Sequence, residues 1–182
     1  MKLTKLSVAA LVFAGVVSSS NAANNTNSGE VHFKGSVVDT PCNLAPGKDG
    51  ERVEVDFGQL SQAWLNANTA NKATQTFSIN LENCTFGDPA TKNTASITFK
   101  GQQLGATTNV LSTTGSAQNL GISITPFGAT APVTLGTAYD FPTKLSNGHS
   151  SLDFTAQAYK AGAADVTAGT FEAISQFEIA YK

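Results

Sequence analysis

The chain has 182 residues, with 11 basic against 13 acidic side chains and a formal net charge of −2 at neutral pH. Only 13% of the residues are charged and no basic cluster is present, which argues against nucleic acid as a partner. Hydrophobic residues make up 41%, enough for one domain with a sizeable core and a mostly neutral, polar surface.

Residues 1–22 have the features of a secretory signal peptide. Two lysines precede an apolar stretch, residues 6–17, that is too short to span a bilayer, and small residues at 20 and 22 suit a cleavage site. We therefore expect the mature chain to be residues 23–182. It retains nine of the 11 basic residues against 13 acidic ones, a formal charge of −4. We expect no transmembrane helix in it and no membrane insertion.

The mature chain begins with a segment that is polar at first and then alternates. After several Asn, Thr, Ser and Gly residues, Val31 and Phe33 alternate with polar neighbours, and Gly35 lies on the same side. Period-2 alternation predicts a half-buried strand. We interpret residues 23–37 as an N-terminal extension and residues 38–182 as the domain that follows it.

Cys42 and Cys84 are the two cysteines of the chain. In a secreted protein they are most simply explained by one disulfide. It would close a 43-residue loop, which the chain-entropy model values at roughly 4 kcal/mol. A redox or metal role is the alternative, but no CxxC motif or Cys/His cluster accompanies the pair.

Alternating apolar and polar residues predict short strands through the rest of the chain. We expect strands at residues 53–57, 77–84, 95–100, 109–112, 121–126, 132–135 and 151–160. Trp64-Leu65 is expected to be a plug with a turn of helix in a loop, with burial of Trp64 favoured over its exposure. Asn147-Gly148 favours a hairpin. Many short strands without a long helix indicate an all-β sandwich of immunoglobulin type.

The last fourteen residues predict one final strand after Gly169. Glu172, Gln176 and Glu178 fall on one face, because side chains alternate across a strand. The other face carries Phe171, Ala173, Phe177, Ile179 and Tyr181, interrupted by the polar Ser175. Such a strand must pair on both edges, be capped, or remain an open edge that is a template for another chain. We favour the open edge.

The sequence contains no recognisable catalytic constellation. His32 lies on the polar face of the first alternating segment and His149 follows a turn, and there is no GxSxG, HExxH or glycine-rich phosphate loop. Glu172 and Glu178 are six residues apart, roughly 20 Å at strand rise, too far for a carboxylate pair. We therefore expect neither enzymatic activity nor a cofactor or metal.

The order and spacing of these features resemble the major subunits of bacterial type 1-like fimbriae, which the chaperone–usher pathway assembles. The likeness rests on the signal, the polar arm, Val-His-Phe-Lys-Gly at 31–35, the two cysteines, Leu-Glu-Asn-Cys at 81–84, Asn147-Gly148, and the ending with Gly169 and a penultimate Tyr181. The resemblance implies an incomplete immunoglobulin-like sandwich that lacks its last strand and is completed by donor-strand exchange.

The same resemblance implies partners and a location. A periplasmic pilus chaperone fills the groove first, and at the outer-membrane usher the extension of the next identical subunit replaces it. Minor tip or adhesin subunits complete a fimbria on the bacterial surface that supports attachment. The implied donor residues are Val31, Phe33 and Gly35, and the implied groove and chaperone-contact residues are Gly169, Phe171, Phe177, Ile179 and Tyr181. Gly35 would cross a narrow part of the groove, or would be a simple bulge or turn glycine.

Three further interpretations stay open. A minor subunit of the same pathway would have similar features, although a single domain with an arm before it and an open strand at its end favours the major subunit. A stand-alone secreted immunoglobulin-like binding module would supply its own last strand, and the extension would then be dispensable. A periplasmic enzyme would need a pocket.

Overall fold

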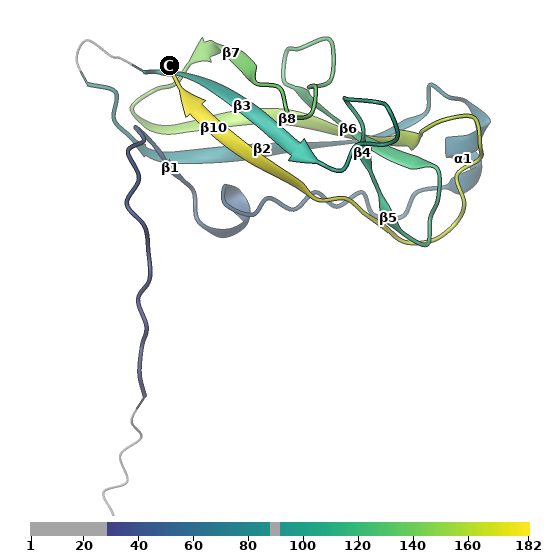
Figure 1. The fold of residues 1–182 in the computed structure, drawn as a ribbon, viewed down its shortest axis with the longest axis horizontal. Helices are drawn as coiled ribbons and strands as arrows, with labels where there is room; N and C mark the ends of the chain where they lie inside the picture. Colours follow the sequence, from purple (N-terminus) through teal and green to yellow (C-terminus); the bar gives the residue numbers. More distant parts are fainter. Residues whose placement is uncertain (1–28, 88–91) are drawn as a thin grey trace, which may run out of the picture. The chain divides into compact units, whose positions relative to one another are not determined.

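The computed structural model describes residues 29–87 and 92–182 (Figure 1). The signal expected at residues 1–22 therefore lies outside the described residues. The chain divides into two units, residues 1–37 and 38–182, and each is considered by itself. In the described part of the first unit the backbone forms no helix or strand, and Phe33 is 91% exposed. The strand expected from the alternation is not formed here, because a strand needs a partner for its backbone hydrogen bonds.

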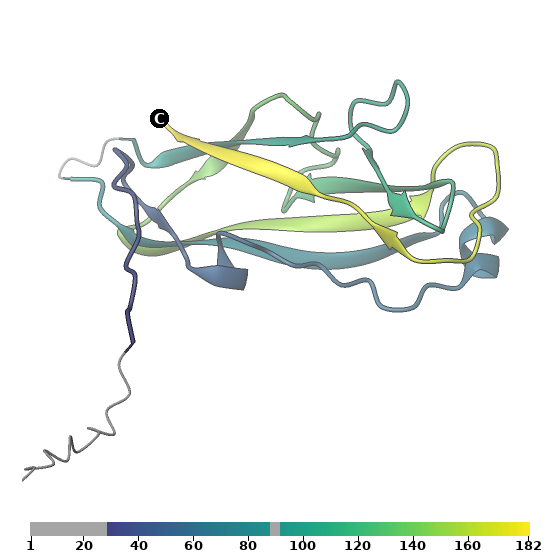
Figure 2. The same ribbon diagram turned by 60° about the horizontal axis from the view of Figure 1, so that its bottom comes forward.

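The second unit is built from two main antiparallel sheets and one small one (Figures 1 and 2). The five-stranded sheet has the order β1 (Asn43–Leu44), β2 (Lys72–Cys84), β8 (Gly148–Lys160), β6 (Leu120–Pro126), β4 (Leu111–Ser112). The three-stranded sheet has the order β10 (Ser175–Tyr181), β3 (Thr94–Gly101), β7 (Tyr139–Lys144). The small sheet pairs β5 (Thr114–Gly115) with β9 (Phe171–Glu172). The expected all-β sandwich is confirmed.

A phenylalanine cluster joins the two main sheets at the centre of the core. Phe154 of β8 is 1% exposed and stacks on Phe77 of β2, with ring centroids 5.1 Å apart. Across the sandwich its ring meets Phe99 of β3 at 5.2 Å and Phe141 of β7 at 5.8 Å, both edge to face. Edge-to-face packing places the positive ring edge on the negative ring face. The apolar faces of these strands thus bury one another.

The single α-helix of the described chain, α1 (Gln62–Ala67), places one of its two large apolar side chains inward. Leu65 is 2% exposed, whereas Trp64 is 44% exposed, so the expected buried Trp64 is wrong. Successive helical residues point about 100° apart, and both cannot face the core of a short surface helix. Asn66 ties the helix to a distant loop, because its amide group bonds both the N–H and the carbonyl of Val166 at 2.8 and 3.0 Å. The other helical element is the 3₁₀ turn η1 (Gly47–Asp49).

Several expected strands differ in the structure. Residues 53–57 and 132–135 form no strand, although Val133 N–H donates to the Ile124 carbonyl at 2.8 Å. Strand β7 was not expected. It contains Pro142, and proline is tolerated mainly at sheet edges such as this one. Asn147 lies in a turn between β7 and β8, which belong to different sheets, so the turn is not a hairpin of paired strands.

The expected single C-terminal strand is divided into β9 and β10. Strand β10 pairs with β3 residue by residue, from Ser175 opposite Gly101 to Tyr181 opposite Ala95. Because β3 ends at Gly101, the residues that precede Ser175 have no partner in β3, and β9 pairs with β5 instead.

Among the described residues, no helix is long and apolar enough to cross a bilayer.

Candidate functional site

One side of the sandwich carries two backbone segments without a strand partner. Strand β10 is at the edge of its sheet, with β3 on one side and no strand on the other. Residues 53–60, between η1 and α1, belong to no sheet, and none of the backbone–backbone hydrogen bonds of the described chain involves them (Figure 1). Unpaired backbone groups of this kind can accept an added strand.

A groove in two compartments lies between these segments. The first, of about 590 Å³, has Val53 on one wall and Phe177 on the other. Its floor is apolar and consists of Phe77, Ile79, Phe99, Leu111, Ile122, Ile124 and Ala156. The second compartment, of about 540 Å³, lies beside α1 and is lined by Leu60, Leu65, Leu120 and Val166, among others. Val55, Phe57 and Phe171 line both compartments, so the two compartments adjoin at these residues.

The predicted two-faced pattern of the C-terminal strand is present in β10. Phe177, Ile179 and Tyr181 are half-buried on the core side, while the residues between them are exposed. The Phe177 ring lies 6.3 Å from that of Phe99. Ser175, which interrupts this apolar face, has its hydroxyl hydrogen-bonded, because it donates to the Lys100 carbonyl at 3.2 Å. The apolar face of β10 therefore reaches the core but is not covered.

Charged groups lie on the outer face of β10. Lys100 Nζ is 2.7 Å from Glu178 Oε2, and its hydrogen bond and positive charge lower the pKa of Glu178. On the core side, burial raises the pKa of Tyr181. Lys182 exchanges two backbone hydrogen bonds with Thr94, which fixes the end of the strand. These interactions hold β10 in register on β3.

Among the described residues, no group of three His, Cys, Asp or Glu side chains is placed to bind a metal.

Gly169 lines the second compartment and occupies a position that requires glycine. Its φ is +154°, and a Cβ atom there would lie 2.4 Å from Ser116 Oγ and 2.5 Å from the Ala117 nitrogen. Thr170 follows, and its carbonyl accepts a hydrogen bond from Ala117 N–H at 3.0 Å. The glycine thus lets the chain pass close to residues 116 and 117 before Phe171 enters the groove wall.

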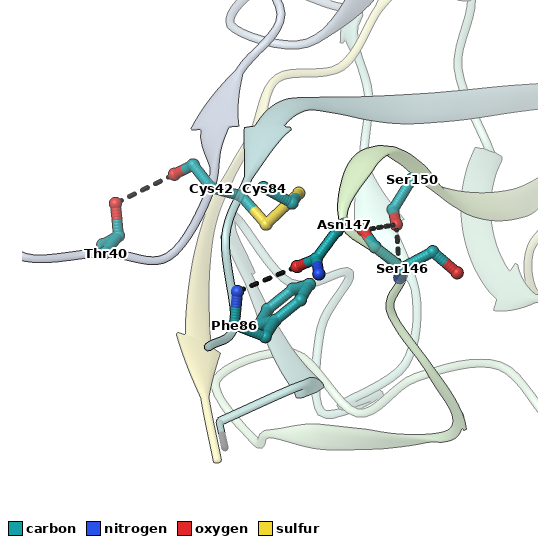
Figure 3. The surroundings of a disulfide bond; sticks show 7 residues. All are labelled: Thr40, Cys42, Cys84, Phe86, Ser146, Asn147 and Ser150. Atoms are coloured by element: carbon teal, nitrogen blue, oxygen red, sulfur yellow. Dashed lines mark hydrogen bonds between the residues drawn. A yellow bond between two sulfur atoms is a disulfide. The ribbon is translucent and has the colours of Figure 1, made fainter. Parts of the chain in front are cut away.

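The predicted disulfide between Cys42 and Cys84 is formed and buried, with exposures of 4% and 3% (Figure 3). It joins the start of the domain to the end of β2. Beside it, Asn147 Oδ1 accepts a hydrogen bond from Phe86 N–H at 2.9 Å. The disulfide belongs to the scaffold, and its two cysteines lie outside the lining of both groove compartments.

The structure brings the predicted groove residues of the C-terminal segment onto the core side of one edge. Phe171 and Phe177 line the groove, and Ile179 and Tyr181 continue the same face. Residues 53–57, which form the opposite wall of the groove, were not predicted to belong to it. Their alternation predicts a paired strand, and only the structure shows that this segment has no strand partner.

The predicted donor residues Val31, Phe33 and Gly35 belong to the other unit of the chain. Val31 is 72% exposed, and a Cβ atom on Gly35 would meet no other atom within 4 Å. Their insertion in a groove therefore stays a prediction.

The model of the family described as fimbrial protein matches residues 31–182. Fimbria A protein of Serratia marcescens is 38% identical, and the type-1 fimbrial protein A chain of Escherichia coli K12 is 32% identical; both alignments cover all of this chain and all of the relative. A chain in a solved chaperone–usher pilus has a TM-score of 0.70 and 30% identity over 86% of this chain and 96% of that one. The P pilus rod subunit PapA has a TM-score of 0.63 and 28% identity, over 79% of this chain and 100% of PapA.

Proposed function

The chain belongs to the fimbrial protein family, and from this premise we propose that it polymerises head to tail, with residues 23–37 of one copy inserted in the groove of the next. Its role is that of a structural subunit of the pilus rod. The immunoglobulin-like domain is residues 38–182, the extension is residues 23–37, and residues 1–22 are the signal that is removed on secretion. The rod extends from the bacterial surface and supports attachment.

The observation that carries this proposal is the groove with one unpaired backbone on each wall. A strand placed between β10 and residues 53–57 would find hydrogen-bonding groups on both sides and an apolar floor below. Donor-strand complementation of pilins is an established example of such strand addition. An arm at one end and a groove elsewhere form a heterologous contact, which generates open filaments.

The exposed extension has the complementary pattern. Phe33 is 91% and Val37 103% exposed, and both lie on the same side as Val31 and Gly35 when side chains alternate. Burying Phe33 in a neighbour's groove contributes roughly 1.5–3 kcal/mol. The polar residues His32 and Lys34 then face away from the groove.

The other partners follow from the same open groove. An apolar groove left empty favours aggregation, so we assign it to the periplasmic chaperone before assembly. The usher exchanges that strand for the next subunit's arm, and minor tip or adhesin subunits use the same contacts. The role is structural and not enzymatic, in keeping with the fimbrial family to which the chain belongs.

Phe33→Asp tests the inserted strand. The change places an unpaired charge in an apolar site, which costs much more than the lost contacts. We expect fibres to disappear, while the chaperone still co-purifies with the subunit because the arm is not needed for that complex. His32→Asp, on the opposite face, is the matched control and should leave most fibres. Fibres are counted by electron microscopy. Normal fibres from Phe33→Asp, or equal loss from both changes, would contradict the proposal.

A further inference from the structure

Trp64 is the single tryptophan of the chain, and side-chain hydrogen bonds hold the helix that presents it. The Trp64 N–H donates to the Ser61 hydroxyl at 3.3 Å, and the Trp64 carbonyl accepts a hydrogen bond from the Asn71 amide at 2.6 Å. The Gln62 amide donates to the Val166 carbonyl of a distant loop at 2.9 Å. A helix of six residues would be marginal by itself, so these bonds fix the place of the exposed ring. Tryptophan is enriched among the residues that carry most of the binding energy of protein interfaces.

The Trp64 ring lies outside the groove. Two residues of the same helix, Gln62 and Leu65, line the second compartment, whereas Trp64 is not part of its lining. Successive helical side chains point about 100° apart, so Trp64 lies on another side of the helix than the two residues that border the compartment. An arm inserted in the groove therefore leaves this ring to be covered by another segment.

Helix α1 and the start of the domain lie at opposite ends of the sandwich (Figures 1 and 2). Strand β2 joins the two ends, because it begins at Lys72, shortly after α1, and ends at Cys84. Its 13 residues span about 40 Å at strand rise. The disulfide holds Cys42, near the first residue of the domain, at the far end of β2. Head-to-tail stacking of copies then brings the start of one domain to the α1 end of another.

The direction of the inserted arm leads to the same end. All paired strands of the described chain are antiparallel, and we place the arm antiparallel to β10 as well. Strand β10 runs from Ser175, on the α1 side, toward the C-terminus at the opposite end (Figure 1). An antiparallel arm thus ends, at Val37, near the second compartment beside α1. Val38 is the next residue, and alternation puts it on the outward face of the arm, which is otherwise polar.

We propose that Trp64 is a docking platform for a second copy, and that Val38 of the copy whose arm fills the groove packs on the Trp64 ring. This inference rests on the proposed function. Both side chains are apolar, and Val38 is 62% exposed in the chain by itself. The platform continues the interface of the inserted strand onto the end of the sandwich. A second contact beside that strand restricts the rotation of one domain against the next, which stiffens the rod.

The test uses the fluorescence of Trp64 in the full secreted chain, which has no other tryptophan. An excess of synthetic peptide releases the chain from its chaperone and fills the groove, so that the copies stay separate. A peptide of residues 23–37 ends before the platform, and a peptide of residues 23–41 reaches it. We expect the longer peptide, compared with the shorter one, to move the Trp64 emission maximum to shorter wavelength and to lower its quenching by acrylamide, because water leaves the ring.

Two changes in the longer peptide identify the residue that meets the ring. Val38→Ser should abolish the emission shift and speed the dissociation of the peptide about tenfold, which corresponds to about 1.4 kcal/mol. Asp39→Ser, at the neighbouring position and on the other side of the segment, is the matched control and should change neither. Dissociation is timed by competition with a labelled peptide.

Equal emission with the two bound peptides would overturn the platform, as would a shift that survives Val38→Ser or that Asp39→Ser removes equally. Shielding of Trp64 in assembled fibres but not by the longer peptide would assign the ring to a lateral neighbour in the rod, and would also overturn it. The proposed function is tested apart from this, because both peptides then occupy the groove whatever Trp64 does, and Phe33→Asp in either peptide prevents binding. Binding unaffected by Phe33→Asp would mean that the arm is not the inserted strand.

Discussion

Strands β8 and β10 have the same alternating pattern but different surroundings. Strand β8 lies between β2 and β6, and its apolar residues Leu152 and Phe154 are only 2% and 1% exposed. Strand β10 has β3 on one side alone, and its apolar residues Phe177 and Ile179 are only half-buried. Alternation defines which face is apolar, but full burial needs a neighbour on both sides. The difference identifies β10 as one border of a place for a further strand.

The largest effect that would sharpen this comparison is expected in β8. Phe154→Ala removes the ring that joins both sheets, and a fully buried Phe→Ala change typically costs about 3–5 kcal/mol. We expect the secreted chain to unfold at much lower urea concentration, whether or not the groove is filled. The free energy of unfolding of each variant is measured by urea unfolding, followed by the fluorescence of Trp64. A loss below about 1 kcal/mol would contradict the central role of this ring.

A smaller and conditional effect is expected in β10. Phe177→Ala should cost about 1 kcal/mol in the unfilled chain, since the side chain is only half-buried there. With the groove filled by a synthetic peptide of residues 23–37, the cost should rise to about 2–3 kcal/mol, because the ring is then covered. The measurement is urea unfolding with and without the peptide. Equal costs in both states would mean that the peptide does not cover this face.

The smallest effect concerns the outer face of β10. Lys100 lowers the pKa of Glu178. The pair therefore stabilises the fold at pH values above the ordinary carboxyl pKa, and this stabilisation is lost as the pH falls through the lowered pKa of Glu178. Lys100→Gln should return the pKa of Glu178 toward its usual range, and the two proteins should become equally stable in acid. The effect should be small and screened by salt, since the pair is exposed. NMR titration of the Glu178 carboxyl checks it, and an unchanged pKa in Lys100→Gln would refute the assignment.

The sequence by itself determined the fold class, the disulfide and the inward face of β10. Short alternating segments bounded by turns indicate an all-β sandwich or barrel, and the resemblance to fimbrial subunits favours the immunoglobulin-like sandwich. Two cysteines in a chain whose sequence predicts a secretory signal have one simple explanation. Side-chain alternation is a property of the backbone, so the half-buried side of Phe177, Ile179 and Tyr181 was predictable from their positions alone.

Only the tertiary structure decided which alternating segments are paired. Residues 53–57 and β8 have similar patterns, yet the first has no partner and the second has two. Alternation records which side of a segment meets apolar surroundings, whereas pairing depends on which backbone lies alongside it. The same reason explains the break between β9 and β10, because β3 ends at Gly101. It also explains why the contact between the rings of Phe57 and Phe171, whose centroids lie 6.1 Å apart, was not visible in the sequence.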